Sequence, residues 1–216
     1  MQVVFEAIQS LDLSVLSWMR SFHSPVLVGI AVAVSFVAWK GWFWWLVVAA
    51  SWLRGQKRFS VDLALGVAIA TIAGLPLKGL IARPRPDLYA SQQLNIPMQE
   101  LLSTQHSFPS GHTLLAAVFA FVLVKYYKDY RSWLAVAFVA LVGLSRIYGG
   151  YHWPSDVVGS AIMGALAAFV AGKVAELPFI ARFTTPRPVA VPGFLVPHSE
   201  LNLETIDDKE PVSISR

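Results

Sequence analysis

One stretch in the second half of the chain, Ser145–Asp156, reads S-R-I-Y-G-G-Y-H-W-P-S-D and places charged groups directly before an apolar segment. Pro154 suits the first turn of a helix, and the residues after it stay apolar long enough to cross a bilayer. His152 and Asp156 are then about one helical turn apart, so the carboxylate can fix the tautomer of the imidazole. Arg146 can offer a fork of donors to a phosphate. The stretch therefore predicts a membrane helix with a reactive site at its start.

The composition is that of a membrane protein. Of the 216 residues, 56% are hydrophobic and 14% are charged, which is too apolar for an ordinary soluble domain. The formal net charge of +4 is small enough for basic loops to explain it, so no nucleic-acid partner is expected. The chain has no cysteine, which excludes disulfides, thiolate chemistry and Cys-ligated metals and leaves the redox compartment open.

Residues 1–38 predict an N-terminal interfacial or re-entrant helical segment. The first 23 residues place apolar side chains on one helical face with polar residues between them, as in a helix that lies in the membrane interface. These apolar residues are Val4, Ile8, Leu11, Val15, Trp18 and Phe22. Glu6 and Asp12 precede any long apolar run, so no cleaved signal peptide is expected. Pro25–Trp39 is shorter than the roughly 20 residues that a crossing needs, and one crossing from about Phe36 to Leu53 fits the length better.

Four later segments are long and apolar enough to complete a helical bundle. They are Val61–Leu80, His112–Tyr127, Trp133–Tyr148 and Pro154 to about Val174. With the crossing before Leu53 they give five full crossings, and six is the alternative. The expected fold class is therefore all-α, a polytopic transmembrane bundle in which residues 39–176 form the membrane-embedded core.

Basic residues gather in the loops after Leu53 and Tyr127 and after the last span. They are Arg54, Lys57, Arg58, Lys125, Lys128, Arg131, Lys173, Arg182 and Arg187. By the positive-inside rule this side is cytoplasmic, and residues 177–216 are expected to be a disordered cytoplasmic tail. Ser145–Asp156 would then face the outside, or periplasm, of the inner (plasma) membrane.

Two further groups of residues fall on the same face as Ser145–Asp156. In the first, Lys78 lies near the end of a span that then delivers Arg83 and Arg85, and ionisable groups at the rim of a bilayer usually serve function. In the second, Phe108–Thr113 reads F-P-S-G-H-T and opens a span. Ser110 is a good N-cap, Gly111 lets a ligand approach the backbone, and the first-turn amides can bind a phosphate within reach of His112.

Each of these residues alone also has a structural explanation. A lysine or arginine near a span end usually extends to the headgroups, and Pro109–Gly111 alone is a common capping turn. His112 and His152 alone could each be a satisfied interfacial histidine. Their joint placement with several cations, an aspartate and a helix start suited to phosphate favours a functional site.

The same residues resemble the signature of the type 2 phosphatidic acid phosphatases, membrane lipid phosphatases related to bacterial acid phosphatases and vanadium haloperoxidases. The three parts of that signature are K-x6-R-P, P-S-G-H and S-R-x5-H-x3-D. All three are present without a deviation, as Lys78 with Arg85-Pro86, Pro109–His112, and Ser145-Arg146 with His152 and Asp156. The resemblance covers about residues 40–175 and does not extend to the first 23 residues or the tail.

The resemblance implies that His152 attacks phosphorus to form a phosphohistidine, with Asp156 orienting it. His112 would protonate the leaving oxygen and then activate the hydrolytic water. The phosphoryl oxygens would be bound by Lys78, Arg85, Arg146, the Ser110 hydroxyl and the Gly111 amide. Because fixed cations and helix amides can supply the charge neutralisation that Mg²⁺ supplies elsewhere, no metal and no cofactor are expected. Arg83 lies outside the signature and is a further candidate for substrate contact.

The expected partner is a lipid phosphate in the bilayer, and the oligomeric state stays open. Undecaprenyl pyrophosphate, phosphatidylglycerol phosphate, phosphatidic acid and a lipid A phosphate all present a suitable group, and the loop before Phe108 is expected to help admit the lipid. The alternatives are a lipid phosphotransferase, a non-enzymatic transporter or scaffold, and a vanadate-dependent oxidase, against which a site open to lipid argues.

Overall fold

The computed structural model describes residues 2–22, 24–37, 41–86 and 106–184, and over these ranges the chain is helical without a named strand. Its helices are α1 (Gln2–Ser21), α2 (Pro25–Val37), α3 (Gly41–Leu53), α4 (Lys57–Ile81), α6 (Gly111–Tyr126), α7 (Tyr130–Tyr148), α8 (Pro154–Val174) and α9 (Pro178–Ala181). The predicted all-α class is confirmed. The expected substrate loop, residues 87–105, and the tail beyond residue 184 lie outside the described residues, and α9 occupies the first part of the segment expected as tail.

Three helices of the described chain, α4, α7 and α8, are long and apolar enough to cross a membrane, whereas α2, α3 and α6 are apolar but shorter. The bounds expected for the last four spans agree with α4, α6, α7 and α8 to within a few residues. The crossing expected from about Phe36 to Leu53 includes residues 38–40, which lie outside the described residues. On either side of them, α2 ends at Val37 and α3 begins at Gly41.

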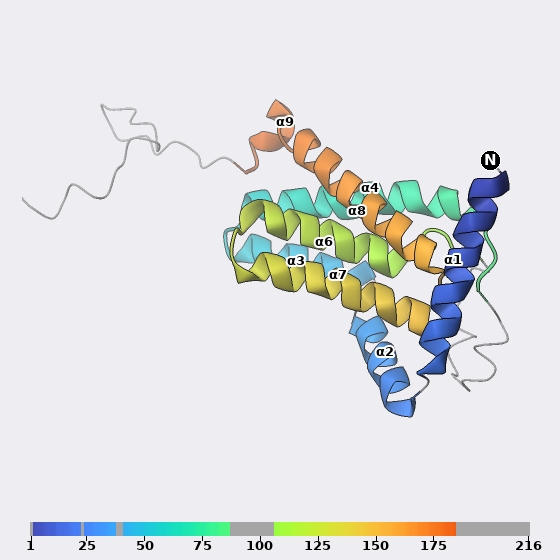
Figure 1. Cartoon of the computed structure of the whole chain (residues 1–216). Coiled ribbons are helices and arrows are strands. Elements are labelled where there is room, and N and C mark those ends of the chain that lie inside the picture. The colour runs from blue at the N-terminus through green and yellow to red at the C-terminus, as the bar shows by residue number, and fades with distance from the viewer. Residues whose placement is uncertain (1, 23, 38–40, 87–105, 185–216) are drawn as a thin grey trace, which may run out of the picture. The chain divides into compact units, whose positions relative to one another are not determined.

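Helix α6 packs against α4, α7 and α8, and α4 also packs against α8 (Figure 1). The buried core between these helices includes Leu63, Val118, Val122 and Val142, while Trp44 joins it from α3. Small residues bring the axes close: a Cβ at Gly164 of α8 would lie 2.3 Å from the carbonyl oxygen of Leu114 on α6. Large apolar side chains on the outer faces are exposed, as contact with lipid requires. Examples are Ile72, Leu75, Leu141, Ile162, Leu166 and Phe169.

The alternating directions of α4, α6, α7 and α8 determine where the motifs meet. The C-terminal ends of α4 and α7 and the N-terminal ends of α6 and α8 lie together at one end of the bundle (Figure 1). We call this the site end, because all three sequence motifs fall there. The basic loops before α4 and between α6 and α7 fall at the opposite end.

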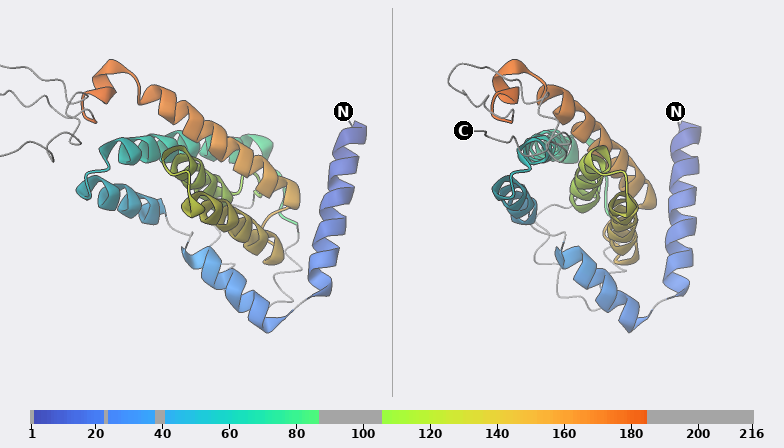
Figure 2. Two further views of the ribbon diagram at one scale, coloured as in Figure 1. Left: turned by 60° about the vertical axis from the view of Figure 1, so that its left-hand side comes forward. Right: turned by 90° about the vertical axis from the view of Figure 1, so that its left-hand side faces the viewer.

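Helix α1 runs across the site end and contacts α7 and α8 (Figure 2). The apolar residues predicted to face the membrane, such as Leu11 and Trp18, are exposed, as an interfacial helix requires. The opposite side of α1 is turned toward the protein and buries Leu16 and Asp12. A buried carboxylate on this helix was not expected from the sequence.

Candidate active site

The residues of the three motifs come from four different helices and the turns beside them. Lys78 lies in the last turn of α4 and Arg146 in the last turn of α7, while His112 and Asp156 lie in the first turns of α6 and α8. His152 stands in the short turn between α7 and α8. The positive φ of +70° at Gly150 reverses the chain there, which few other residues allow.

The structure brings these groups into one electrostatic environment. Both histidines interact electrostatically with Lys78, Arg85 and Arg146. His112 also interacts with His152. Asp156 interacts with Lys78, Arg85 and His152. The two histidines, Asp156 and the three cations of the motifs therefore lie within reach of one another's charges.

His152 and Asp156 form the centre of the site and are both fully enclosed. His152 Nδ1 lies 3.9 Å from Asp156 Oδ2, slightly beyond hydrogen-bonding range, and catalytic hydrogen bonds are often this long without substrate. Asp156 Oδ2 accepts the backbone N–H of Trp153 at 3.0 Å, which fixes the carboxylate at the start of α8. Burial, and then the cations Arg146, Arg85 and Lys78, lower the pKa of His152 to about 3 despite the opposing effect of Asp156. A pKa this low favours the neutral imidazole at physiological pH, the form that can act as a nucleophile.

Tyr151 organises the two arginines of the site. Its ring lies under the guanidinium of Arg146, 4.2 Å from ring centroid to Cζ, and its carbonyl oxygen accepts Arg85 Nη1 at 2.7 Å. Burial raises the pKa of Tyr151, so its hydroxyl stays protonated between these cations. This role of Tyr151 was not predicted from the sequence, although the residue lies between Arg146 and His152 in the third motif.

Several enclosed polar atoms of the site have no hydrogen-bond partner within the described residues. They are Arg146 Nε, His112 Nε2, Tyr151 Oη and His152 Nδ1. Unpaired buried polar atoms are rare in proteins and costly, because each loses its hydration. Their concentration around one point indicates a site that binds a polar ligand.

The start of α6 is open toward this point. A Cβ at Gly111 would meet no atom within 4 Å, which agrees with the predicted approach of a ligand to the backbone. Ser110 occupies the N-cap position as expected, but its hydroxyl pairs with Thr113 Oγ1 at 3.1 Å instead of capping the backbone. Gly111, His112 and Lys78 border a cavity of about 200 Å³ that continues between apolar residues of α4 and α6. The helix dipole favours an anion at this helix start.

Arg83 does not have the geometry expected of a substrate contact. Its Nη1 donates to Asp156 Oδ1 at 2.5 Å and to Ser155 Oγ at 2.8 Å, and its Nη2 donates to Asp12 Oδ2 at 2.7 Å. Two carboxylates therefore hold this guanidinium. The contact between Asp12 and Arg83 was not predicted from the sequence, in which Asp12 stands out only as an acidic residue of an amphipathic helix.

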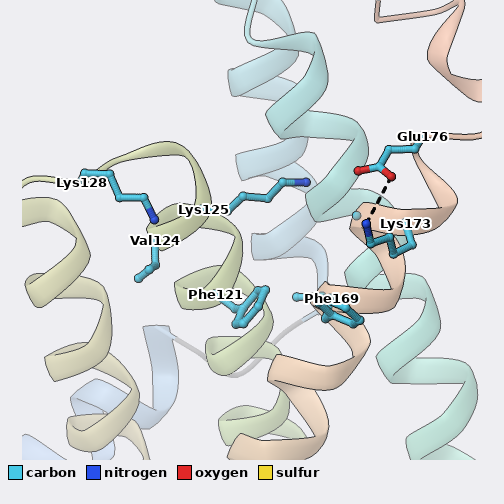
Figure 3. Close-up of a pocket in the computed structure, with 9 residues that line it drawn as sticks. Phe121, Val124, Lys125, Lys128, Phe169, Lys173 and Glu176 are labelled. Carbon is cyan, nitrogen blue, oxygen red and sulfur yellow. Dashed lines mark ion pairs between the residues drawn. The ribbon is translucent and has the colours of Figure 1, made fainter.

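A larger cavity of about 350 Å³ lies at the other end of α6 and α8 and is not part of this site (Figure 3). It is lined by Lys125, Lys128 and Lys173 above the rings of Phe121 and Phe169 and contains no residue of the motifs. Two of the lysines are already paired: Lys125 with Asp62 at 2.5 Å, and Lys173 with Glu176 at 3.5 Å. These lysines fit the basic loops predicted for the cytoplasmic side.

Residues 59–176, more than half of the chain, match the family model described as the PAP2 superfamily. The chain belongs to this superfamily. Undecaprenyl-diphosphatase BcrC of Bacillus subtilis is 31% identical over 74% of this chain and 82% of its own length. An undecaprenyl-diphosphatase of Sulfolobus acidocaldarius is 27% identical over 60% of this chain. The matched region covers 63% of that relative's length, slightly less than two thirds. The expected family is confirmed.

Two solved structures are similar in fold to this chain. Aquifex aeolicus LpxE matches with a TM-score of 0.64 and 25% identity over 76% of this chain and 95% of that chain. A transmembrane PAP2-type phosphatidylglycerolphosphate phosphatase of Bacillus subtilis matches with a TM-score of 0.62 and 26% identity over 79% of this chain and 87% of that chain. Several relatives are named phosphatases or diphosphatases, which agrees with the expected class of enzyme, a hydrolase of phosphate monoesters or pyrophosphates in a membrane.

Proposed function

We propose that this protein is a membrane lipid phosphatase that hydrolyses a lipid phosphate or pyrophosphate through a phosphohistidine on His152. The observation that carries the proposal is the enclosed, neutral His152 beside Asp156, surrounded by Lys78, Arg85 and Arg146. A neutral imidazole is a nucleophile, and the cations compensate the charge that repels nucleophiles from phosphate esters.

The reaction proceeds in two displacements. His152 Nε2 attacks phosphorus, because Nδ1 faces Asp156, and the bond from phosphorus to the lipid oxygen breaks as His112 donates a proton to that oxygen. His112 then accepts a proton from water, whose oxygen displaces the imidazole from phosphorus and forms free phosphate. Asp156 stabilises the positive imidazole formed in the first step. Lys78, Arg85, Arg146, the Ser110 hydroxyl and the Gly111 amide bind the phosphoryl oxygens in both steps.

We propose an undecaprenyl-type polyprenyl diphosphate as the substrate. The support is the name of the two relatives described above and the cavity beside His112, whose polar end would take a phosphate and whose apolar walls would contact a chain. Phosphatidylglycerol phosphate is the second candidate, favoured by the structural match to a phosphatase of that lipid. A transferase that passes the phosphoryl group to another lipid would use the same residues and differ in its product.

We propose five crossings, with the site outside the plasma membrane and the tail in the cytoplasm. The backbone N–H of Ser24 and the carbonyl oxygen of Phe22 both bond to Tyr148 Oη at the site end, at 2.9 and 3.2 Å. Ser51 Oγ contacts Ser60 Oγ at 2.7 Å near the opposite end. These contacts lie at opposite ends of the bundle, which supports α2 and α3 together as a single crossing.

The test is phosphate release by the purified protein in detergent with EDTA, across a panel of lipid phosphates and diphosphates. We expect activity in the chelator, inhibition by vanadate, and loss of at least about 10³-fold in His152→Ala. His112→Ala should regain part of its activity with an aryl phosphate, whose acidic leaving group needs less protonation, and His152→Ala should not. A strict need for Mg²⁺ or Zn²⁺, or an active His152→Ala, would contradict the proposal.

A further inference from the structure

Asp12 is an unusual residue for the protein-facing side of a membrane-surface helix. It is 2% exposed, whereas the other acidic residue of α1, Glu6, is exposed. Burial of a charged carboxylate is costly unless partners replace its hydration. Asp12 must therefore be compensated by specific contacts, and these lead to the active site.

The carboxylate of Asp12 joins α1 to the first turn of α8. Its Oδ1 accepts the backbone N–H of Ser155 at 2.8 Å, and its Oδ2 accepts the Ser155 hydroxyl at 2.5 Å. This amide belongs to the first turn of α8, where no intrahelical acceptor is available to it. Asp12 thus gives α8 a negatively charged cap from a helix that lies 143 residues earlier in the chain.

The same carboxylate reaches the catalytic pair through Arg83. Arg83 Nη2 donates to Asp12 Oδ2 at 2.7 Å, while its Nη1 donates to Asp156 Oδ1 at 2.5 Å. One guanidinium therefore bridges a carboxylate of α1 and the carboxylate that faces His152. The positive charge of Arg83 partly neutralises Asp156 and so weakens the attraction between Asp156 and a positive His152. The negative charge of Asp12 compensates part of the charge of Arg83 and so restores that attraction.

We propose that Asp12 is a positioning residue of the active site: through Arg83 and Ser155 it holds Asp156 in the orientation and with the negative charge that His152 requires. The proposal rests on the proposed function. It makes α1 part of the functional unit, although α1 lies outside the residues 59–176 that match the family model.

The experiment compares the kinetics of Asp12→Asn, which removes the charge and keeps the shape, with those of the exposed control Glu6→Gln. We expect kcat to fall about 10–100-fold in Asp12→Asn with KM changed less than about threefold, as for loss of an outer partner of a functional group. Glu6→Gln should equal the wild type. Asp12→Glu, which keeps the charge, should retain more of kcat than Asp12→Asn.

A double-mutant cycle with Arg83→Met tests whether Asp12 acts through Arg83. If it does, Asp12→Asn lowers kcat in the wild type but has little further effect in Arg83→Met. Wild-type kcat in Asp12→Asn, or losses that multiply in the double variant, would overturn the proposal.

Hydrogen exchange supplies a second measurement that needs no activity. The amides of Trp153 and Ser155 donate to Asp156 and Asp12, so both should exchange faster in Asp12→Asn and not in Glu6→Gln. Unchanged exchange would overturn the proposal. If the wild type releases no phosphate from any lipid, the proposed function fails, while the exchange result still decides whether Asp12 holds the start of α8.

Discussion

At the scale of single residues, the protonation of His152 is governed by its surroundings. Its pKa falls from 6.5 to about 3, first because of burial and then because of the nearby cations. In the unfolded chain the same imidazole binds a proton below about pH 6.5. Between these two pH values the unfolded state holds a proton that the native state lacks, so stability must decrease as the pH falls.

His152→Asn tests this coupling, because asparagine is polar and does not titrate. The wild type should lose up to about 1.4 kcal/mol of stability per pH unit from this group as the pH falls below about 6.5. The variant should lack that contribution and show a smaller decrease in melting temperature between pH 6.5 and pH 4, measured in detergent. Parallel curves for the two proteins would show that His152 is protonated in the folded state.

Arg146 offers a second residue-scale prediction, since it is 4% exposed and stacks on Tyr151. Arg146→Lys keeps the charge but loses the planar fork and the stacking, so we expect kcat/KM to fall about 10²-fold or more. Arg131 at the other end of α7 also stacks on a tyrosine, Tyr127, but is exposed. Arg131→Lys is therefore the matched control and should keep wild-type activity.

The motif residues could be singled out from the sequence because each motif is short and chemically distinctive, whereas the roles expected of them came from the family resemblance. It did not predict the partners of Arg83. Asp12 and Asp156 lie 71 and 73 residues away from it, and no pattern in one sequence indicates which distant carboxylate a guanidinium will meet. For that reason Arg83 was expected to contact substrate.

At the scale of helices, the close approach of α6 and α8 depends on Gly164. Gly164→Ala would place a methyl group against the carbonyl of Leu114, and overpacking of this kind costs roughly 1–3 kcal/mol. The control is Gly29→Ala in α2, where an added Cβ meets nothing within 4 Å and alanine favours a helix by about 1 kcal/mol. Thermal unfolding in detergent should show a lower melting temperature for Gly164→Ala and an unchanged or higher one for Gly29→Ala.

Helix bounds were predictable where apolar segments end at distinctive residues, as at Pro154 of α8. They were not predictable between Pro25 and Leu53, because continuous apolar runs carry no periodicity from which to locate an end. The structure describes α2 and α3 in this segment, where an interfacial or re-entrant helix followed by one crossing was expected, and packs α2 against α7 and α3 against α4.

At the scale of the whole molecule, we propose that the site end and the basic end lie on opposite sides of the membrane. The chain has no cysteine, so single cysteines can report each side. We expect Ser91→Cys in the loop outside the described residues, and Ser10→Cys on the exposed side of α1, to react with an impermeant thiol reagent in intact cells. Lys128→Cys, at an exposed position of the basic end, should react only after permeabilisation.

The pattern of labelling separates the alternatives. If the number of crossings is even, Ser10→Cys should react only after permeabilisation, as Lys128→Cys does. If Ser91→Cys reacts only after permeabilisation and Lys128→Cys reacts in intact cells, the site faces the cytoplasm.

The three residues of the bridge from Asp12 through Arg83 to Asp156 are made at different times during translation. The ribosome adds about 5–20 residues per second, so the 73 residues between Arg83 and Asp156 take roughly 4–15 s to make. During that interval Arg83 has already been made, while its partner Asp156 does not yet exist. Asp12 precedes Arg83 in the chain and can neutralise it at once. Of the two carboxylates that hold Arg83, the one on α1 is therefore the only one already made until synthesis reaches Asp156.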